Sequence, residues 1–203
     1  MSMVVGLTGQ TGAGKSTVSA YARQKGIGVI EADAVAREAL APGSECLLKL
    51  AAVFGNDIIG EDGSCNRAVL AAKAFSDKKN TRLLNQITHP WIIERTKEYI
   101  SEMTNNHYDM ILFDASQLFE SGGDKLCDHI AAVVADEQIR LDRIMNRDKI
   151  SREAALRRMR VQLEEGFFRE RAEFIIDGSL SLEEVKKQAD SIFERLMRKE
   201  TDL

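Results

Sequence analysis

Short apolar runs alternate along this 203-residue chain with stretches whose apolar residues recur at helical spacing. The apolar runs predict buried strands over residues 3–7, 28–32, 110–114, 130–135 and 174–177. The stretches between them predict helices, each with one apolar face. Alternation of strands and helices is typical of an α/β fold, so the pattern predicts a sheet flanked by helices.

From about residue 44 to residue 106 the strand pattern nearly disappears. A helical stripe from Leu47 to Phe54 stops at Gly55-Asn56, and Asn66 is placed to cap the next helix. A further helical pattern runs up to His89-Pro90, where the proline is expected to interrupt it before an amphipathic helix over residues 91–103. Residues 34–106 therefore predict a helical insertion that could bind an acceptor substrate, or else helices that simply cover the sheet.

The sharpest motif follows the first strand. Residues 9–16 read Gly-Gln-Thr-Gly-Ala-Gly-Lys-Ser and fit the phosphate-binding pattern G-x-x-x-x-G-K-[ST]. Glycines let the backbone turn tightly and aim N–H groups at an anion at a helix N-terminus. A glycine-rich turn that merely starts a helix is the other interpretation, but it does not require Lys15 and Ser16. Lys15 is expected to reach the β- and γ-phosphates, and the Ser16 hydroxyl to bind Mg²⁺. The predicted ATP-binding residues are Gly9, Gly12, Ala13, Gly14, Lys15, Ser16 and Thr17.

Two acidic residues stand at the ends of predicted strands. Asp33 follows the second strand, and ligands of open α/β sheets collect at the carboxyl ends of strands. It is a candidate catalytic group, a helix N-cap, or both. Asp114 ends the run Met110–Phe113, and a carboxylate there suits Mg²⁺, which prefers oxygen ligands. The alternative for Asp114 is a strand-end cap.

Arginine is concentrated late in the chain, since nine of the sixteen arginines fall within residues 140–171. One interpretation is a solvated helix with supporting pairs such as Glu153 and Arg157. The other is a lid over residues 147–166 that closes guanidinium groups on a transferring phosphoryl group, whose oxygens they match. The nine are Arg140, Arg143, Arg147, Arg152, Arg157, Arg158, Arg160, Arg169 and Arg171.

Composition narrows the class of protein. Apolar residues make up 44% and charged residues 30%, and no apolar run approaches the roughly 20 residues that cross a bilayer. The net charge of −4 disfavours a nucleic-acid partner. Nothing near the N-terminus suggests secretion, and the three cysteines form no C-x-x-C pair. We therefore expect a cytoplasmic protein that binds neither nucleic acid nor membrane.

Taken together, these residues resemble the dephospho-coenzyme A kinase family nearly from end to end. The matching pieces are Leu7-Thr8-Gly9 with residues 12–17, Ala32-Asp33 with Ala36-Arg37, Phe54-Gly55, His89-Pro90, Leu118-Phe119-Glu120, Arg143 with Arg147-Asp148, and Ile175-Ile176-Asp177.

The resemblance implies a P-loop NTPase fold with a parallel five-stranded sheet flanked by helices, a helical acceptor-binding insertion and a short arginine-rich lid. It also implies a single kinase domain over residues 1–203 that phosphorylates the ribose 3′-hydroxyl of dephospho-coenzyme A with ATP and Mg²⁺, the last step of coenzyme A synthesis. Asp33 would be the general base or orient the hydroxyl, while Arg147 and Arg143 would stabilise charge beside Lys15. Arg37 and His89 would lie at the acceptor. A monomer or a weak homo-oligomer is expected.

Some positions depart from the family pattern, and alternatives remain open. The family usually has glycine at Gln10, Asp at Glu31, Pro-Leu at Ser116-Gln117, Asp at Glu173 and Asn at Gly178. Another small-molecule kinase, acting on a nucleoside monophosphate, would share the same loop and lid. A nucleotide-dependent switch is disfavoured because no Asn/Thr-Lys-x-Asp tetrapeptide occurs to read guanine.

Overall fold

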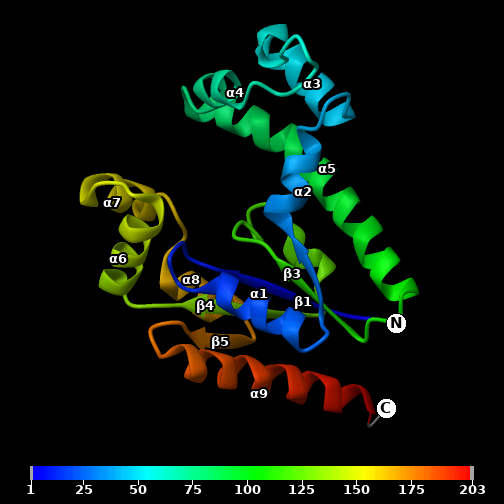
Figure 1. The fold of residues 1–203 in the computed structure, drawn as a ribbon, viewed down its shortest axis with the longest axis vertical. Coiled ribbons are helices and arrows are strands. Elements are labelled where there is room, and N and C mark those ends of the chain that lie inside the picture. The colour runs from blue at the N-terminus through cyan, green and yellow to red at the C-terminus, as the bar shows by residue number, and fades with distance from the viewer. Residues whose placement is uncertain (1, 202–203) are drawn as a thin grey trace. The chain divides into compact units, whose positions relative to one another are not determined.

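The computed structural model describes residues 2–201, with side chains described as far as residue 198. Its contacts divide the chain into two compact units. The first combines Met1–Val29 with Ile100–Leu203, and the second is Ile30–Tyr99. The chain is coloured from the N-terminus to the C-terminus in Figure 1.

A five-stranded sheet has the strand order β2-β3-β1-β4-β5. Its strands are β1 (Met3–Gly9), β2 (Gly28–Glu31), β3 (Met110–Asp114), β4 (His129–Val134) and β5 (Phe174–Asp177). Strand β1 pairs in parallel with β3 and with β4, and β4 pairs in parallel with β5. The predicted α/β architecture is confirmed. Because β1 is the central strand, the loop after Gly9 emerges from the middle of the carboxyl edge.

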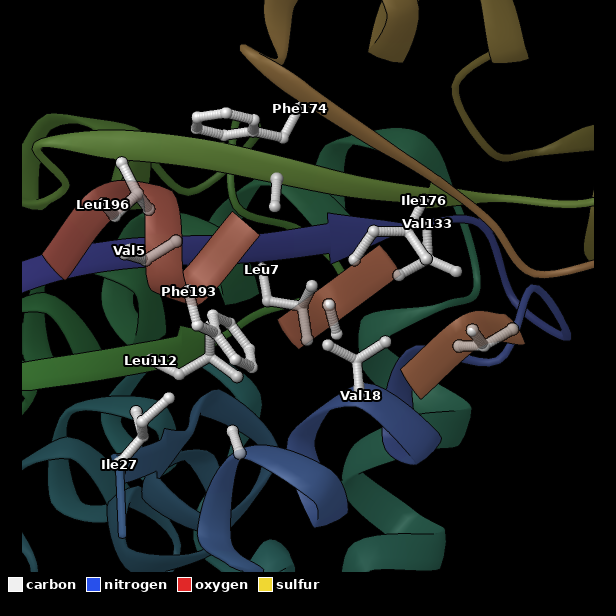
Figure 2. Close-up of a cluster of buried hydrophobic side chains, with 14 of the residues drawn as sticks. Val5, Leu7, Val18, Ile27, Leu112, Val133, Phe174, Ile176, Phe193 and Leu196 are labelled. Carbon is white, nitrogen blue, oxygen red and sulfur yellow. The ribbon is translucent and has the colours of Figure 1, made fainter. Parts of the chain in front are cut away.

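Strand β1 is buried along its whole length, as an apolar run covered on both faces requires. One face carries the helices α1 (Lys15–Gln24) and α9 (Leu182–Thr201), whose apolar side chains pack on the strands (Figure 2). Each such side chain contributes about 1.5–3 kcal/mol when it is fully buried. The side chains labelled there are Val5, Leu7, Val18, Ile27, Leu112, Val133, Phe174, Ile176, Phe193 and Leu196.

Capping residues in the first unit match their sequence signals. Ser181 and Glu184 form a capping box at the start of α9, since the Ser181 N–H donates to Glu184 and the Glu184 N–H donates to the Ser181 hydroxyl. Earlier in the chain, Asp136 and Ser151 are the N-caps of the helices that begin at Glu137 and Arg152. The remaining elements are η2 (Gly123–Leu126), α6 (Glu137–Asp148), α7 (Arg152–Arg160) and α8 (Glu165–Arg171).

The second unit has its own apolar core. Leu47, Leu50 and Phe54 form the predicted stripe, and the helix that carries them ends at Gly55, where φ is 100°. The Asn66 side chain accepts from the Val69 N–H at 3.2 Å, which confirms the predicted cap. The helices are α2 (Ala32–Ala39), α3 (Glu45–Phe54), η1 (Asn56–Ile58), α4 (Arg67–Ala74) and α5 (Lys78–Asn105), the last belonging to this unit as far as Tyr99.

The predicted interruption at Pro90 is wrong, because α5 runs through it without a break. A proline inside a helix removes the hydrogen bond to the carbonyl four residues earlier, here that of Gln86, at a cost of about 3 kcal/mol. Apolar side chains on both sides of Pro90 pack against the core of the second unit and offset that cost. They are Leu83, Leu84, Ile87 and Trp91.

Candidate functional site

The glycines of the loop between β1 and α1 are required by close backbone contacts. Gly9, Gly12 and Gly14 have φ angles of 144°, 81° and 106°, which L side chains rarely adopt. A Cβ atom on Gly9 would lie 2.2 Å from the carbonyl oxygen of Val133. One on Gly12 would lie 2.7 Å from the carbonyl oxygen of Arg140. The loop is therefore pressed between β4 and α6 with no room for side chains at these points.

The N-terminus of α1 is open to an anion. Its cap, Gly14, has no side chain to accept from the first N–H groups, and the described first turn contains no acidic residue. Ser16 is exposed in this turn, and Lys15 precedes it. The helix end thus presents uncapped N–H groups and an exposed hydroxyl, with a lysine as the first helical residue, as phosphate binding requires.

Lys15 contacts the carboxylate at the end of β3. Its ammonium group pairs with one oxygen of Asp114, and the hydroxyl of Ser19 donates to the other oxygen. The side chains of Lys15 and Asp114 are 19% and 8% exposed, so this contact is largely screened from water. Sequence reasoning missed Ser19, although its spacing of one helical turn from Lys15 places both on the same face of α1.

Arginines of α6 hold the other side of the loop. The Arg143 guanidinium donates to the carbonyl oxygens of Gly12 and Ala13, at 3.2 and 3.3 Å. The Arg140 Nε donates to the Thr11 carbonyl at 3.1 Å. Arg140 is only 6% exposed, and this burial lowers the pKa of its guanidinium. Of the nine clustered arginines, Arg143 and Arg140 thus contact the loop, while the role of Arg143 in stabilising charge stays a prediction.

Arg147 lies one turn beyond Arg143 on α6, but its side chain makes a different contact. It donates to both carboxylate oxygens of Asp148, at 2.7 and 2.9 Å, and is 60% exposed. This partner raises the pKa of the Arg147 guanidinium, while Arg158 from α7 pairs with the same carboxylate. Figure 1 shows α6 and α7 side by side. The structure therefore brings Arg143, but not Arg147, into contact with the phosphate loop.

The start of the loop contacts the segment after α7. The Gln10 side chain donates to the Leu163 carbonyl at 3.0 Å. The Thr11 N–H donates to the Gln162 side-chain oxygen at 3.1 Å, and the Gln162 amide group donates to the Thr11 hydroxyl at 2.6 Å. Sequence reasoning missed Gln162, which belongs to no motif that carries recognised chemistry.

The predicted acceptor-side residues belong to the second unit. Asp33 is the second residue of α2, not its cap, because the cap position is occupied by Glu31. The interpretation of Asp33 as an N-cap is therefore wrong; the strand before it is shorter than expected, so the helix begins earlier. Asp33 and Arg37 are exposed and lie one turn apart on α2, while His89 is partly buried on α5.

One departure from the family pattern lies directly against the loop. The Gly178 N–H donates to the Val134 carbonyl at 2.7 Å, and a Cβ atom on Gly178 would lie 1.9 Å from the carbonyl oxygen of Ala13. The backbone after β5 therefore approaches the phosphate loop more closely than any side chain would permit. At another of the departing positions, the Glu173 carboxylate lies 2.5 Å from the Nδ1 atom of His129.

Comparison with known proteins identifies the family. A family model described as dephospho-CoA kinase matches residues 3–184. The dephospho-CoA kinase of Listeria monocytogenes serovar 1/2a is 37% identical over 202 residues, which cover 98% of this chain and 99% of that protein. The chain belongs to the dephospho-CoA kinase family. The dephospho-CoA kinase of Syntrophotalea carbinolica is also 37% identical, over 96% of this chain and 92% of its own length.

Solved structures share the fold of this chain. The protein TT1252 from Thermus thermophilus superposes with a TM-score of 0.80 at 28% identity and covers 96% of this chain and 98% of its own. The dephospho-CoA kinase from Campylobacter jejuni gives 0.74 at 24% identity, over 98% and 100% of the two chains. A shikimate kinase from Acinetobacter baumannii shares the fold, with a TM-score of 0.55 at 14% identity.

Proposed function

We propose that this chain transfers the γ-phosphoryl group of ATP to the ribose 3′-hydroxyl of dephospho-coenzyme A. The observation that carries the proposal is a phosphate loop with Lys15 and Arg143 beside it, in a chain that matches the dephospho-CoA kinase model over residues 3–184. Among the residues that the structure describes, none of the helices has the length and apolar character that a membrane span needs.

The phosphate loop would bind the triphosphate and stabilise its charge in the transition state. Phosphoryl transfer depends more on positioning and charge neutralisation than on strong base catalysis. Residues 12–17 would supply backbone N–H groups, and Lys15 would contact the β- and γ-phosphates. Arg143, held by two loop carbonyls, would add positive charge next to the loop. Arg147, within the proposed lid of residues 147–166, would have to exchange its carboxylate partner for a phosphate.

The residues present fit Mg²⁺ bound partly through the nucleotide. No cluster of three or more His, Cys, Asp or Glu side chains suited to a metal occurs among the described residues. Mg²⁺ in such enzymes typically uses one or two protein oxygens together with phosphates and water. The Asp114 carboxylate, oriented by Ser19, and the exposed Ser16 hydroxyl would hold it. The ion would neutralise charge on the phosphates.

Asp33 is the proposed acceptor-side group. Its exposed carboxylate, two residues after the end of β2, would accept or orient the proton of the 3′-hydroxyl. Arg37 lies one helical turn away and would bind an anionic part of the acceptor, with His89 nearby in the complex. The helices of residues 34–106 would thus form the acceptor-binding part of a single kinase domain. This proposal requires Asp33 to reach the terminal phosphate when both substrates are bound.

The decisive experiment measures ADP release from ATP and Mg²⁺ with dephospho-coenzyme A, with nucleoside monophosphates, and with water alone. Dephospho-coenzyme A is expected to support rapid turnover. The Lys15→Ala variant is expected to abolish this turnover and therefore serves as the negative control. A fast rate only with a nucleoside monophosphate would reassign the acceptor. Equal rates with and without any acceptor would instead indicate a slow hydrolase.

A further inference from the structure

The side chain of Gln162 bonds to two elements of the phosphate-loop region at once. Its oxygen accepts from the Thr11 N–H at 3.1 Å and from the Arg140 guanidinium at 3.2 Å. Its nitrogen donates to the Thr11 hydroxyl at 2.6 Å. Gln162 lies two residues after α7, so one amide group joins the end of that helix to the loop and to α6.

A second contact fixes the neighbouring residue. The Gln10 side chain, only 7% exposed, donates to the Leu163 carbonyl at 3.0 Å. Two consecutive residues after α7 are thus bonded to two consecutive residues at the start of the phosphate loop.

One partner of the Gln162 side chain, Arg140, is a buried cation. Its buried guanidinium is hydrogen-bonded to the Thr11 carbonyl and the Gln162 side chain. A buried charge is expensive to leave without partners, so removing the Gln162 oxygen would free the guanidinium to move. That movement would shift the Thr11 end of the loop, next to where the terminal phosphate is expected to bind.

We propose that Gln162 is a positioning residue for phosphoryl transfer, which holds the start of the phosphate loop and Arg140 in one arrangement with the segment after α7. The inference rests on the proposed kinase activity but concerns a residue outside its phosphate motif. A misplacement of about 1 Å in a reacting group can cost about 10²-fold in rate. The effect is therefore expected in kcat, with little change in the KM for ATP.

The test compares Gln162→Ala with Val161→Ala, because Val161 is the adjacent residue and is 85% exposed. Gln162→Ala is expected to lower kcat by about 10- to 100-fold with the KM for ATP changed less than about threefold. Val161→Ala is expected to stay within about twofold of wild type. Gln162→Glu keeps an oxygen that accepts from Thr11 and Arg140, so it is expected to recover most of the lost rate.

A second readout does not depend on activity. Amide hydrogen exchange at Thr11, measured by NMR, is expected to become at least about 10-fold faster in Gln162→Ala and to be unchanged in Val161→Ala, because the N–H loses its acceptor. If wild type fails to phosphorylate dephospho-coenzyme A, the proposed function is wrong, while the exchange result still decides whether Gln162 fixes the loop.

Wild-type kcat in Gln162→Ala, or unchanged exchange at Thr11, would overturn the positioning role. If Gln162→Ala does not fold, Gln162→Met takes its place, because it keeps the length of the side chain but removes the oxygen that accepts from Thr11 and Arg140. Loss of kcat in Gln162→Met with wild-type KM for ATP would support the role, and wild-type kcat would contradict it.

Discussion

Replacement of Gly12 by alanine tests how tightly the phosphate loop is packed against α6. Gly12 has a φ of 81°, and an added Cβ would lie 2.7 Å from the Arg140 carbonyl oxygen and 3.1 Å from its Cα. Gly26, after the end of α1, is a matched control. Its φ is 79°, but an added Cβ meets nothing within 4 Å. Both glycines belong to the first unit, so both variants report on the same unfolding transition.

Both variants place an alanine in left-handed backbone, but only Gly12→Ala also creates a steric clash. Left-handed backbone costs an alanine about 1–2 kcal/mol, of which about 0.4–1 kcal/mol is offset because alanine restricts the unfolded chain. Gly26→Ala is therefore expected to lower the free energy of unfolding by about 1 kcal/mol. Gly12→Ala adds a clash with backbone atoms that cannot rotate away, worth a further 1–3 kcal/mol or so.

Urea denaturation followed by far-UV circular dichroism gives both free energies. Gly12→Ala is expected to lose about 2–4 kcal/mol and to raise the KM for ATP, because the loop must move away from Arg140. Gly26→Ala is expected to leave the KM for ATP unchanged. Equal losses of stability in the two variants would refute the reasoning, because an alanine at residue 12 would then cause no clash with Arg140.

Three further predictions concern catalysis, a helix and a thiol. Asp33→Asn is expected to lower kcat about 10²- to 10⁴-fold in the ADP-release assay; kcat near wild type would exclude Asp33 as the base. Pro90→Ala is expected to raise the free energy of unfolding in urea by about 1–3 kcal/mol, because it restores a helix hydrogen bond at an exposed position; no gain would mean that α5 is kinked there. Burial raises the pKa of the Cys127 thiol from 9.0 to about 12. Between these two pKa values the thiol of the unfolded chain loses its proton, while the thiol of the folded chain keeps it. The free energy of unfolding, taken relative to that of Cys127→Ala, should therefore be constant below pH 9 and fall by up to about 1.4 kcal/mol per pH unit above it. If the unfolding free energies of wild type and Cys127→Ala changed with pH in parallel, the burial of this thiol would be contradicted.

Local signals in the sequence were sufficient for the sheet and for most helix starts. Each strand is an apolar run, and the caps at Asn66, Asp136, Ser151 and Ser181 bond to backbone N–H groups two or three residues ahead. These interactions involve neighbours in the chain, so their pattern can be read without the fold. Pro90 shows the limit of this approach, because the contacts that keep α5 continuous come from other helices of the second unit.

Candidate site residues carried a recognisable sequence signal mainly where they lie in one segment. Lys15 and Ser16 come from a contiguous motif, whereas the contact between Thr11 and Gln162 joins residues 151 positions apart. Glutamine at the end of a helix carries no distinctive signal, and its role depends on which backbone groups the fold brings to it. The roles assigned to Asp33, Arg37 and His89 stay predictions, since they depend on substrates bound to both units.

Net charge is a poor guide to what this molecule binds. The overall charge is −4, yet positive side chains meet at the phosphate loop. Much of the remaining charge is cancelled locally in exposed pairs, such as Lys49 with Glu45 and Arg169 with Glu165. Arg140 and Arg143 instead donate to carbonyl and amide oxygens, whose dipoles satisfy hydrogen bonds but do not cancel a full charge. The positive potential left at the loop favours a polyanion, and because Arg140 is buried, this attraction is screened less by salt than a surface pair would be. The affinity for ATP is therefore expected to fall less with rising salt concentration than it would if only exposed positive side chains attracted the nucleotide.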